Sequence, residues 1–268
     1  AYIFNRCDLR HHSLESQRSR GTLNGTTYSP RRKTIMTDVL TYEQRIAAQI
    51  EQFRQGVNLH ALPDIFHYWA HNYLRPKIND IFEVDGIADF FASPIAAIAR
   101  SRNGEAIQIL SVGSGDCSVD IMVADALIKQ GVSEFTIHAT ELSPVLIEQA
   151  NQAISGAKLT DHIRCVEVDL NRWSPPSAAF DAAFASHSLH HIENLEHLFA
   201  AIRQSLKPGA VFCVSDMIGR NGHMRWPETL EIFQKFWAIL PESHRYNRLL
   251  SRLELTYINH DCSTQGFE

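Results

Sequence analysis

Five short apolar runs of strand length lie between residues 107 and 215 of this 268-residue chain, at 107–112, 135–140, 163–168, 180–185 and 211–215. Apolar residues recur at helical spacing in three of the intervening segments, over 119–127, 145–154 and 195–206. Parallel strands need a crossover connection, usually a helix. The alternation therefore predicts an α/β fold with a doubly wound, mostly parallel sheet and helices on both faces. Ligands of such sheets bind at the carboxyl ends of the strands.

Residues 37–105 precede the first strand and carry helical patterns. Helices are predicted from Tyr42 onward, with Thr41 as the N-cap, from Pro63 to about Pro76, and over 86–101. We expect this segment to form a helical lid over the ligand site. Its aromatic side chains are candidates to enclose an acceptor, although their helical spacing favours packing onto the sheet; they are Phe66, Tyr68, Trp69, Tyr73, Phe90 and Phe91.

The two ends of the chain differ from the predicted core at 106–218. Residues 1–36 show no sustained periodicity and are predicted to be a poorly ordered leader. Residues 219–268 contain a helical pattern at 226–240 and one short apolar run, 255–258. Sheets of this kind normally continue beyond the fifth strand, so we expect an incomplete C-terminal segment and an open sheet edge.

Composition excludes several classes of protein. The net charge is −5; seven Lys and Arg against two acids give residues 1–36 a charge of +5, which leaves −10 for the remainder. An acidic body makes nucleic acid an unlikely main partner. The longest apolar stretch, 90–99, has ten residues and is interrupted by Pro94, too short to cross a bilayer. The five cysteines form no CxxC pair, which favours a reducing cytoplasm.

A glycine-rich turn follows the first predicted strand. Gly113 and Gly115 lie between that strand and a helix beginning near Ser118. Strand, glycine turn and helix N-terminus in this order let the backbone approach a ligand and favour a negative group. Such a turn alone is also compatible with a purely structural role.

Two acidic residues at later strand ends strengthen the prediction of a nucleotide site. Glu141 ends the second predicted strand, 26 residues after Gly115, where a carboxylate can accept hydrogen bonds from ribose hydroxyls. Asp169 follows the third strand, beside the apolar Leu170, and could accept from an adenine amino group. Three consecutive strand ends thus carry groups suited to an adenosine ligand.

Over about 106–218 the chain resembles the class I S-adenosylmethionine-dependent methyltransferases. The resemblance rests on 109–118, Glu141 with Leu142-Ser143-Pro144, 168–170, 180–191 and 206–209. It implies that Gly113 and Gly115 lie against the methionine part of S-adenosyl-L-methionine and that Glu141 and Leu142 lie at the ribose. Asp169 and Leu170 would then bind the adenine, and Ser186 and His187 would border the sulfonium.

This sequence departs from the family pattern at two positions of the turn. Ser111 stands where an acidic residue usually precedes the glycines, and Cys117 replaces the third glycine. Ser111 can still hydrogen-bond, but a charge interaction with the ligand's ammonium group is lost. The departures concern cofactor affinity rather than the fold.

Three histidines follow the fourth predicted strand, at positions 187, 190 and 191. A neutral histidine can take the proton from a hydroxyl or ammonium acceptor. His190 is the preferred base, because His191 begins the run into the next helix and His187 is close enough to contact the cofactor. Packing or capping roles are equally compatible with the sequence. His187 and His191 would share a helical face, but no nearby Cys or carboxylate completes a metal site, and none is predicted.

The predicted function is methyl transfer from S-adenosyl-L-methionine to a small-molecule acceptor, with oxygen favoured slightly over nitrogen. A first alternative is a nicotinamide-dependent oxidoreductase, whose fingerprint would want Gly or Ala at position 118, where this chain has Ser. A second is a module that binds the cofactor without catalysis, as Ser111 and Cys117 would permit.

Overall fold

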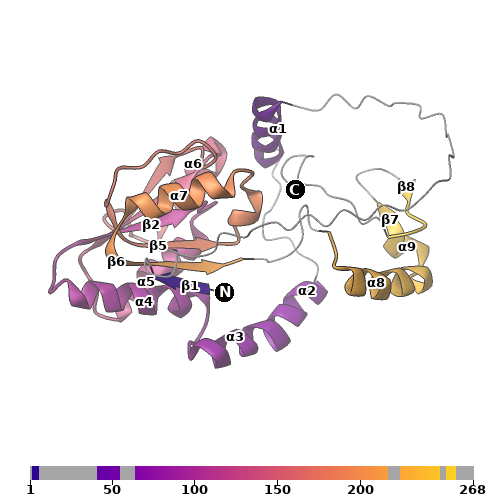
Figure 1. The fold of residues 1–268 in the computed structure, drawn as a ribbon, viewed down its shortest axis with the longest axis horizontal. Helices are drawn as coiled ribbons and strands as arrows, with labels where there is room; N and C mark the ends of the chain where they lie inside the picture. The colour runs from indigo at the N-terminus through magenta and orange to yellow at the C-terminus, as the bar shows by residue number, and fades with distance from the viewer. Residues whose placement is uncertain (1, 6–40, 55–63, 217–223, 248–251, 258–268) are drawn as a thin grey trace, which may run out of the picture.

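The computed structural model describes residues 2–5, 41–54, 64–216, 224–247 and 252–257 (Figure 1). Its centre is a six-stranded sheet with the strand order β1-β6-β5-β2-β3-β4. Strands β2 to β6 are mutually parallel, which confirms the predicted fold class. Their bounds are β2 Ile107–Val112, β3 Phe135–Glu141, β4 Ile163–Glu167, β5 Phe180–Ser186 and β6 Leu206–Ser215.

Helices cover both faces of this sheet because successive strand residues point to opposite sides. On one face Ile109 packs into a core shared with α4 (Ile87–Ser101), α5 (Ser118–Lys129) and α6 (Pro144–Gly156). On the other face Leu110 joins a second core with α7 (Leu195–Ser205). Both cores are built from apolar side chains of the central strands, and together they hold the strand ends in place.

Strand β6 begins earlier than expected. The sequence predicts that Pro208-Gly209 closes the preceding helix, but α7 ends at Ser205 and β6 starts at Leu206. The pairing of β5 with β6 shifts register between Phe180 and Ala182. This irregularity accommodates Pro208, which has no N–H to donate to a sheet ladder.

The sheet edge beyond β6 is covered from the N-terminus. Residues Tyr2–Asn5 form β1, which pairs antiparallel with β6 in the register Tyr2 to Val214 through Asn5 to Val211. Two expectations are wrong here: that the whole leader lacks order, and that the edge beside the fifth parallel strand is open. Pairing with β1 satisfies backbone groups of β6 that an open edge would leave to solvent. The rest of the predicted leader, 6–36, lies outside the described residues.

The N-terminal helices are α1 (Tyr42–Arg54), α2 (Asp64–Trp69), a π-helical turn at Ala70–Leu74, and α3 (Arg75–Phe82). Thr41 caps α1 as predicted: its hydroxyl accepts from the Gln44 N–H at 3.2 Å, and Gln44 Oε1 accepts from the Thr41 N–H at 2.8 Å. The expected helix end near Pro76 is wrong, because Pro76 lies in the first turn of α3, where its missing N–H is not needed.

The aromatic residues of this segment divide into two groups. Phe90 and Phe91 of α4 are fully buried in the core, so they pack beneath the sheet and do not cover a ligand site. Phe66, Trp69 and Tyr73 are 48%, 49% and 61% exposed, which contradicts the favoured expectation that they pack a helix onto the sheet. Figure 1 shows α2 and α3 standing off the sheet.

The C-terminal segment contains α8 (Pro227–Ile239), α9 (Glu242–Arg245) and the strands β7 (Tyr246–Asn247) and β8 (Arg252–Leu253). The two strands pair antiparallel as a separate sheet. The short apolar run at 255–258 forms no strand at 255–257, and Ile258 lies outside the described residues. Within the part of the chain that the structure describes, no helix is both long and apolar enough to span a membrane.

Candidate functional site at the strand ends

The glycine turn connects β2 to α5 in a left-handed backbone conformation. Gly113 has a φ of 68° and Gly115 a φ of 57°, and Cys117 adopts 61° although it is not a glycine. Cys117 thus keeps the conformation that a third glycine would adopt, while its buried side chain packs in the core with its Sγ 3.8 Å from that of Cys165. The departure from the family pattern at 117 leaves the shape of the turn intact.

The two glycines serve different purposes. A Cβ built on Gly113 would lie 2.6 Å from the Cβ of Ser188, so Ser188 leaves no room for a side chain at this position. A Cβ built on Gly115 meets no atom within 4 Å. The turn is therefore open at Gly115, where a ligand can approach the backbone.

We expect Gly113→Ala to lower the free energy of unfolding by about 1–3 kcal/mol, because the added methyl group combines overpacking against Ser188 with an unfavourable positive φ. Chemical denaturation measures the change. Gly156→Ala is a suitable control, since Gly156 ends α6 and an added Cβ there meets no atom. Equal stability of Gly113→Ala and the wild type would contradict the close approach of Ser188.

Glu141, at the end of β3, holds the glycine turn against the following helix. Its Oε1 accepts from the N–H groups of Leu142 and Ser143, both at 2.8 Å, and its Oε2 accepts from the Gly115 N–H at 3.0 Å. Burial raises the pKa of this carboxyl, and the three N–H donors oppose the shift. A carboxylate offers about four lone-pair positions. One therefore remains for a ribose hydroxyl, and a second hydroxyl would have to replace an N–H donor.

Ser111 is buried at the end of β2 and lies beside a second buried polar residue. Its backbone carbonyl accepts from Thr140 Oγ1 at 2.7 Å, and its side chain hydrogen-bonds to Asp120 in the first turn of α5. Asp120 is 1% exposed. Asp120 was not predicted as a site residue. The feature that could have indicated it is an acidic residue within an otherwise apolar face of α5.

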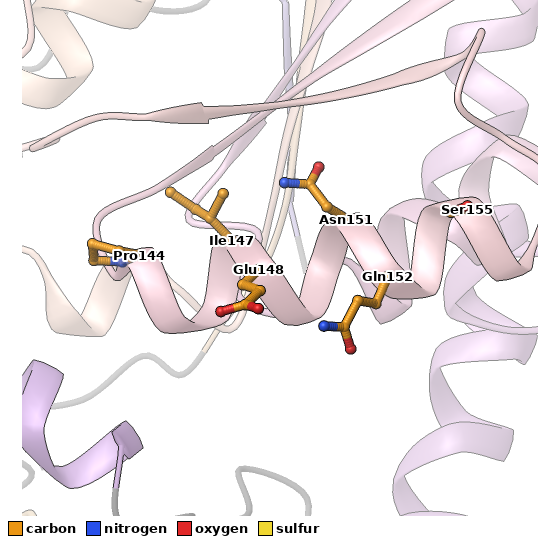
Figure 2. Close-up of a pocket in the computed structure, with 6 residues that line it drawn as sticks. All are labelled: Pro144, Ile147, Glu148, Asn151, Gln152 and Ser155. Carbon is orange, nitrogen blue, oxygen red and sulfur yellow. The ribbon is translucent and has the colours of Figure 1, made fainter.

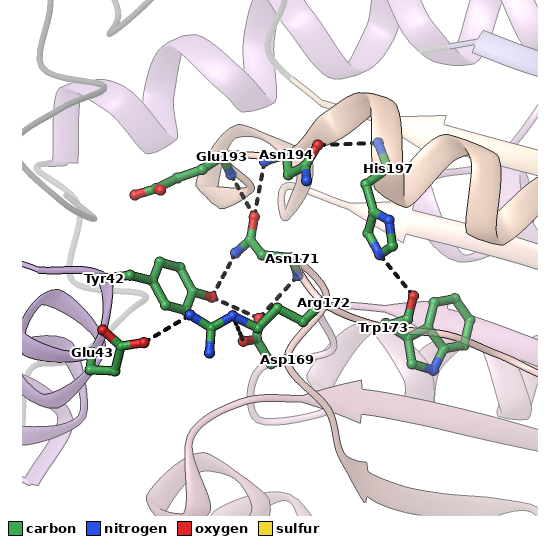
Figure 3. A network of polar contacts seen from close by, with 9 residues as sticks. All are labelled: Tyr42, Glu43, Asp169, Asn171, Arg172, Trp173, Glu193, Asn194 and His197. Carbon is green, nitrogen blue, oxygen red and sulfur yellow. Dashed lines mark hydrogen bonds and ion pairs between the residues drawn. The ribbon is translucent and has the colours of Figure 1, made fainter.

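Asp169 lies two residues beyond the end of β4, in a loop that contacts both α1 and the start of α7 (Figure 3). Its Oδ1 accepts from the Tyr42 hydroxyl at 2.7 Å and from the Asn171 N–H at 3.0 Å. Burial and the hydrogen bond to Asp169 raise the pKa of Tyr42 to about 12. Arg172 stacks over the Tyr42 ring at 4.5 Å and pairs with Glu43 at 2.8 Å. Helix α1 is thereby anchored at the carboxylate predicted to bind adenine.

The same loop is tied to α7 by Asn171. Its Oδ1 accepts from the N–H groups of Glu193 and Asn194, at 2.9 and 3.0 Å. Asn194 in turn caps α7 by accepting from the His197 N–H. The loop carrying Asp169 and the buried Leu170 is thus held from two sides (Figure 3).

The histidine cluster lies after β5. His187 has a φ of 51°, and its N–H donates to the Ser215 carbonyl at 2.8 Å. Partial burial of the ring lowers the pKa of His187. His190 and His191 form a short 3₁₀ turn, Leu189–His191, with ring centroids 4.1 Å apart.

Asp216 directly follows β6 and orients His190. Its Oδ1 is 2.7 Å from His190 Nδ1, and its Oδ2 accepts from the Leu189 N–H at 2.7 Å. Because β6 lies beside β5, with Ser215 opposite Ser186, Asp216 reaches the loop of the neighbouring strand. Sequence analysis missed Asp216; the signal was an acid placed immediately after the fifth parallel strand.

The structure places the predicted site residues at one edge of the sheet. Ser111 lies in the last residues of β2, and Gly113 and Gly115 follow that strand. Glu141 ends β3 and Leu142 follows it, whereas Asp169 and Leu170 follow β4. Ser186 ends β5, and His187 and His190 follow it. Adjacent parallel strands end on the same side, so these residues form one continuous rim. Among the described residues, no group of three His, Cys, Asp or Glu side chains is arranged to hold a metal ion.

An open surface groove of about 680 Å³ lies next to this rim, and Figure 2 shows that its lining comes from α6 alone. The lining residues are Pro144, Ile147, Glu148, Asn151, Gln152 and Ser155. Pro144 begins α6 three residues after Glu141, but none of the predicted site residues lines the groove. We therefore place the candidate site at the strand ends and not in this groove.

The same part of the chain is similar to known methyltransferases. Residues 110–214 match a family model described as a methyltransferase domain. Sterol 4-C-methyltransferase strm-1 of Caenorhabditis elegans is 28% identical over 119 residues, which cover 44% of this chain and 34% of that protein. Sterol methyltransferase-like 1 of Botryococcus braunii is 30% identical over 126 residues, covering 47% and 30%.

A solved structure of a putative S-adenosyl-L-methionine-dependent methyltransferase from Methanococcus maripaludis is 24% identical, covers 65% of this chain and 74% of its own, and has a TM-score of 0.37. The present chain spans about a third of the length of the two curated sterol relatives.

The parallel sheet, the glycine turn and the acidic strand ends define a class I S-adenosylmethionine-dependent methyltransferase domain. The similarity to this family covers residues 110–214, which run from within β2 to within β6 and include the rim from Ser111 to His190.

Proposed function

We propose that this protein transfers a methyl group from S-adenosyl-L-methionine to a small-molecule acceptor bound over the ends of β2 to β5. The contact that carries the proposal is the hydrogen bond between His190 and Asp216 at the rim. It places an oriented base beside Ser186 and His187, which the family resemblance assigns to the sulfonium. The cofactor supplies an activated methyl group, and the protein aligns the acceptor and excludes water.

The residues at the strand ends fit this cofactor. The turn is open at Gly115, and the carboxylates of Glu141 and Asp169 match ribose hydroxyls and an adenine amino group. Ser118, where a dinucleotide fingerprint would want Gly or Ala, begins α5 directly after Cys117. This arrangement supports S-adenosyl-L-methionine over a nicotinamide dinucleotide.

The acceptor is best matched by a small molecule with a hydroxyl group. Asp216 accepts the hydrogen on Nδ1 of His190, and this tautomer makes Nε2 the proton acceptor. Deprotonating a hydroxyl raises its nucleophilicity toward the methyl group. Apolar character of the acceptor is supported by the exposed aromatic residues of α2 and by the names of the sterol relatives. Figure 1 shows α1, α2 and α8 beyond the end of the sheet toward which the strand arrows point.

We also propose a cytoplasmic location. Cys117, Cys165 and Cys213 are free thiols in the described structure, and Cys117 and Cys165 lie close together without a disulfide. Thiols in this state are typical of a reducing compartment.

Binding and turnover measurements test the function. Calorimetric titration with S-adenosyl-L-methionine, S-adenosylhomocysteine and NAD identifies the cofactor. Methyl transfer is then assayed on a panel of sterols, other hydroxyl-bearing apolar molecules and amines. Binding of the sulfonium cofactor with turnover on a hydroxyl acceptor is the expected result. Binding without turnover on any acceptor would favour a non-catalytic module, and tighter binding of NAD would favour the oxidoreductase.

Glu141→Ala should weaken S-adenosylhomocysteine binding at least about tenfold, because it removes a charged hydrogen-bond acceptor worth about 1.5–3 kcal/mol. The variant also removes the acceptor of the Gly115 N–H, so the turn loses its support. Glu167→Ala is the matched control, since Glu167 pairs in register with Glu141 on the neighbouring strand and is exposed. An unchanged dissociation constant in folded Glu141→Ala would remove Glu141 from the ribose site.

A further inference from the structure

Asp120 is a buried carboxylate whose chemistry the site described so far does not use. It lies in the first turn of α5 and is 1% exposed. One of its oxygens, Oδ1, has no hydrogen-bond partner among the residues that the structure describes. Buried carboxylates are normally paired or fully hydrogen-bonded, because removing an ion from water costs far more than burying a neutral group. An unpartnered buried oxygen at this position therefore indicates a missing partner.

The groups around Asp120 do not supply that partner. The Ser111 side chain hydrogen-bonds to it, and Asp116 adds a negative charge that disfavours ionisation. The side chains of Cys117 and Cys165 also lie close enough to interact electrostatically with it. None of the ion pairs found among the described residues includes Asp120. None of the described residues thus supplies Asp120 with a cationic hydrogen-bond donor.

The position of Asp120 limits which cation this can be. Ser111, its hydrogen-bond partner, precedes Gly113 and Gly115 in the turn that is open to a ligand at Gly115. Ser111 also occupies the place where the family pattern carries an acidic residue. An acid in the first turn of α5 is thus hydrogen-bonded to Ser111, which stands where the family pattern has an acidic residue.

We propose that Asp120, positioned by Ser111, is a cofactor-binding residue that receives the ammonium group of the methionine part of S-adenosyl-L-methionine. This assignment rests on the proposed function and specifies which carboxylate holds the amino-acid end of the cofactor. Oδ1 accepts an ammonium N–H, and the hydrogen bond between Asp120 and Ser111 is retained. Binding supplies the countercharge that the buried carboxylate lacks.

The test compares two ligands that differ in their amino-acid end. S-adenosylhomocysteine carries the ammonium group, whereas 5′-methylthioadenosine has the adenosine part without it. Asp120→Asn keeps the shape of the side chain and removes its charge. We expect it to weaken S-adenosylhomocysteine at least about tenfold and to leave 5′-methylthioadenosine within about twofold of the wild type. Asp125→Asn, which removes an exposed charge from the same helix, should change neither.

Two further measurements separate this role from a structural one. The exchange variant Ser111→Asp with Asp120→Ser returns the carboxylate to β2 and should restore S-adenosylhomocysteine affinity to within a few fold of wild type. The pKa of Asp120, raised by burial to about 7, falls when an ammonium group binds. Wild-type affinity for S-adenosylhomocysteine should therefore rise between about pH 6 and 7.5, and the affinity of Asp120→Asn should rise much less over that range.

The outcomes are distinguishable from failure of the proposed function. If the wild type binds neither ligand, the cofactor assignment itself is wrong. If the wild type binds both and Asp120→Asn weakens them equally or not at all, the ammonium role is overturned while the methyltransferase proposal stands. The binding of 5′-methylthioadenosine also reports that each variant is folded.

Discussion

Replacing His190 by alanine is expected to lower methyl-transfer turnover about 10²–10⁴-fold and to leave the affinity for S-adenosylhomocysteine nearly unchanged. Asp216 orients the His190 ring, because its Oδ1 lies 2.7 Å from His190 Nδ1. Neither residue is among those proposed to hold the cofactor. Removing the ring removes the base, whereas the glycine turn and Glu141 remain. Single-turnover kinetics on an accepted hydroxyl substrate, together with calorimetry, measure the two effects separately.

Asp216→Asn extends this test to the residue that positions the base. An asparagine at 216 can present an N–H toward His190 Nδ1, which would place the ring in the wrong tautomer. Turnover should fall less far than in His190→Ala, and the Leu189 N–H keeps an acceptor if the amide oxygen faces it. The exposed His244 of α9 provides the control, because His244→Ala should leave turnover unchanged.

The pH dependence of turnover decides between a base and a packing residue. A histidine base is inactive when protonated, so wild-type turnover should fall as the pH is lowered. His190→Ala should lack this acidic limb. Identical rates and identical profiles in the two proteins would show that alignment alone drives the reaction and that His190 is structural.

Asp120→Asn should stabilise the protein without cofactor by an amount that grows with pH, up to about 4 kcal/mol near pH 8. Burial raises the pKa of Asp120 from 3.8 to about 7. Below about pH 3 the carboxyl is protonated in both the folded and the unfolded protein, so it imposes no charge penalty. As pH rises toward 7 the unfolded chain ionises first, and folding stability is lost until the folded carboxyl ionises as well.

Urea denaturation of wild type and variant at several pH values measures this difference. The gain in Asp120→Asn should be near zero at about pH 3 and largest above about pH 7. Saturating S-adenosylhomocysteine should reduce the gain, because the bound ammonium group compensates the wild-type carboxylate. A difference that stays constant across pH would show that Asp120 is not a charge-bearing buried group.

The sequence was sufficient to predict the parallel sheet, because each strand and helix is encoded by a local period of apolar residues. All six residues of β2 were predicted, and α5, α6 and α7 lie where helical spacing places them. The glycine turn and the strand-end acids Glu141 and Asp169 were visible for the same reason. Each of these residues can be recognised from its position relative to the end of a single predicted strand.

Tertiary structure alone decided the contacts between residues distant in sequence. The pairing of Tyr2–Asn5 with β6 closes an edge that no local pattern assigns to the leader. Asp216 reaches His190 because β6 lies beside β5, and Tyr42 reaches Asp169 across 127 positions. No local sequence pattern marks Asp120 as a ligand-binding residue. Its raised pKa comes from complete burial, and its contact with Ser111 forms only in the folded chain. Burial and strand order arise from packing of the whole chain, so they set charge and hydrogen bonding in ways that a local sequence pattern does not contain.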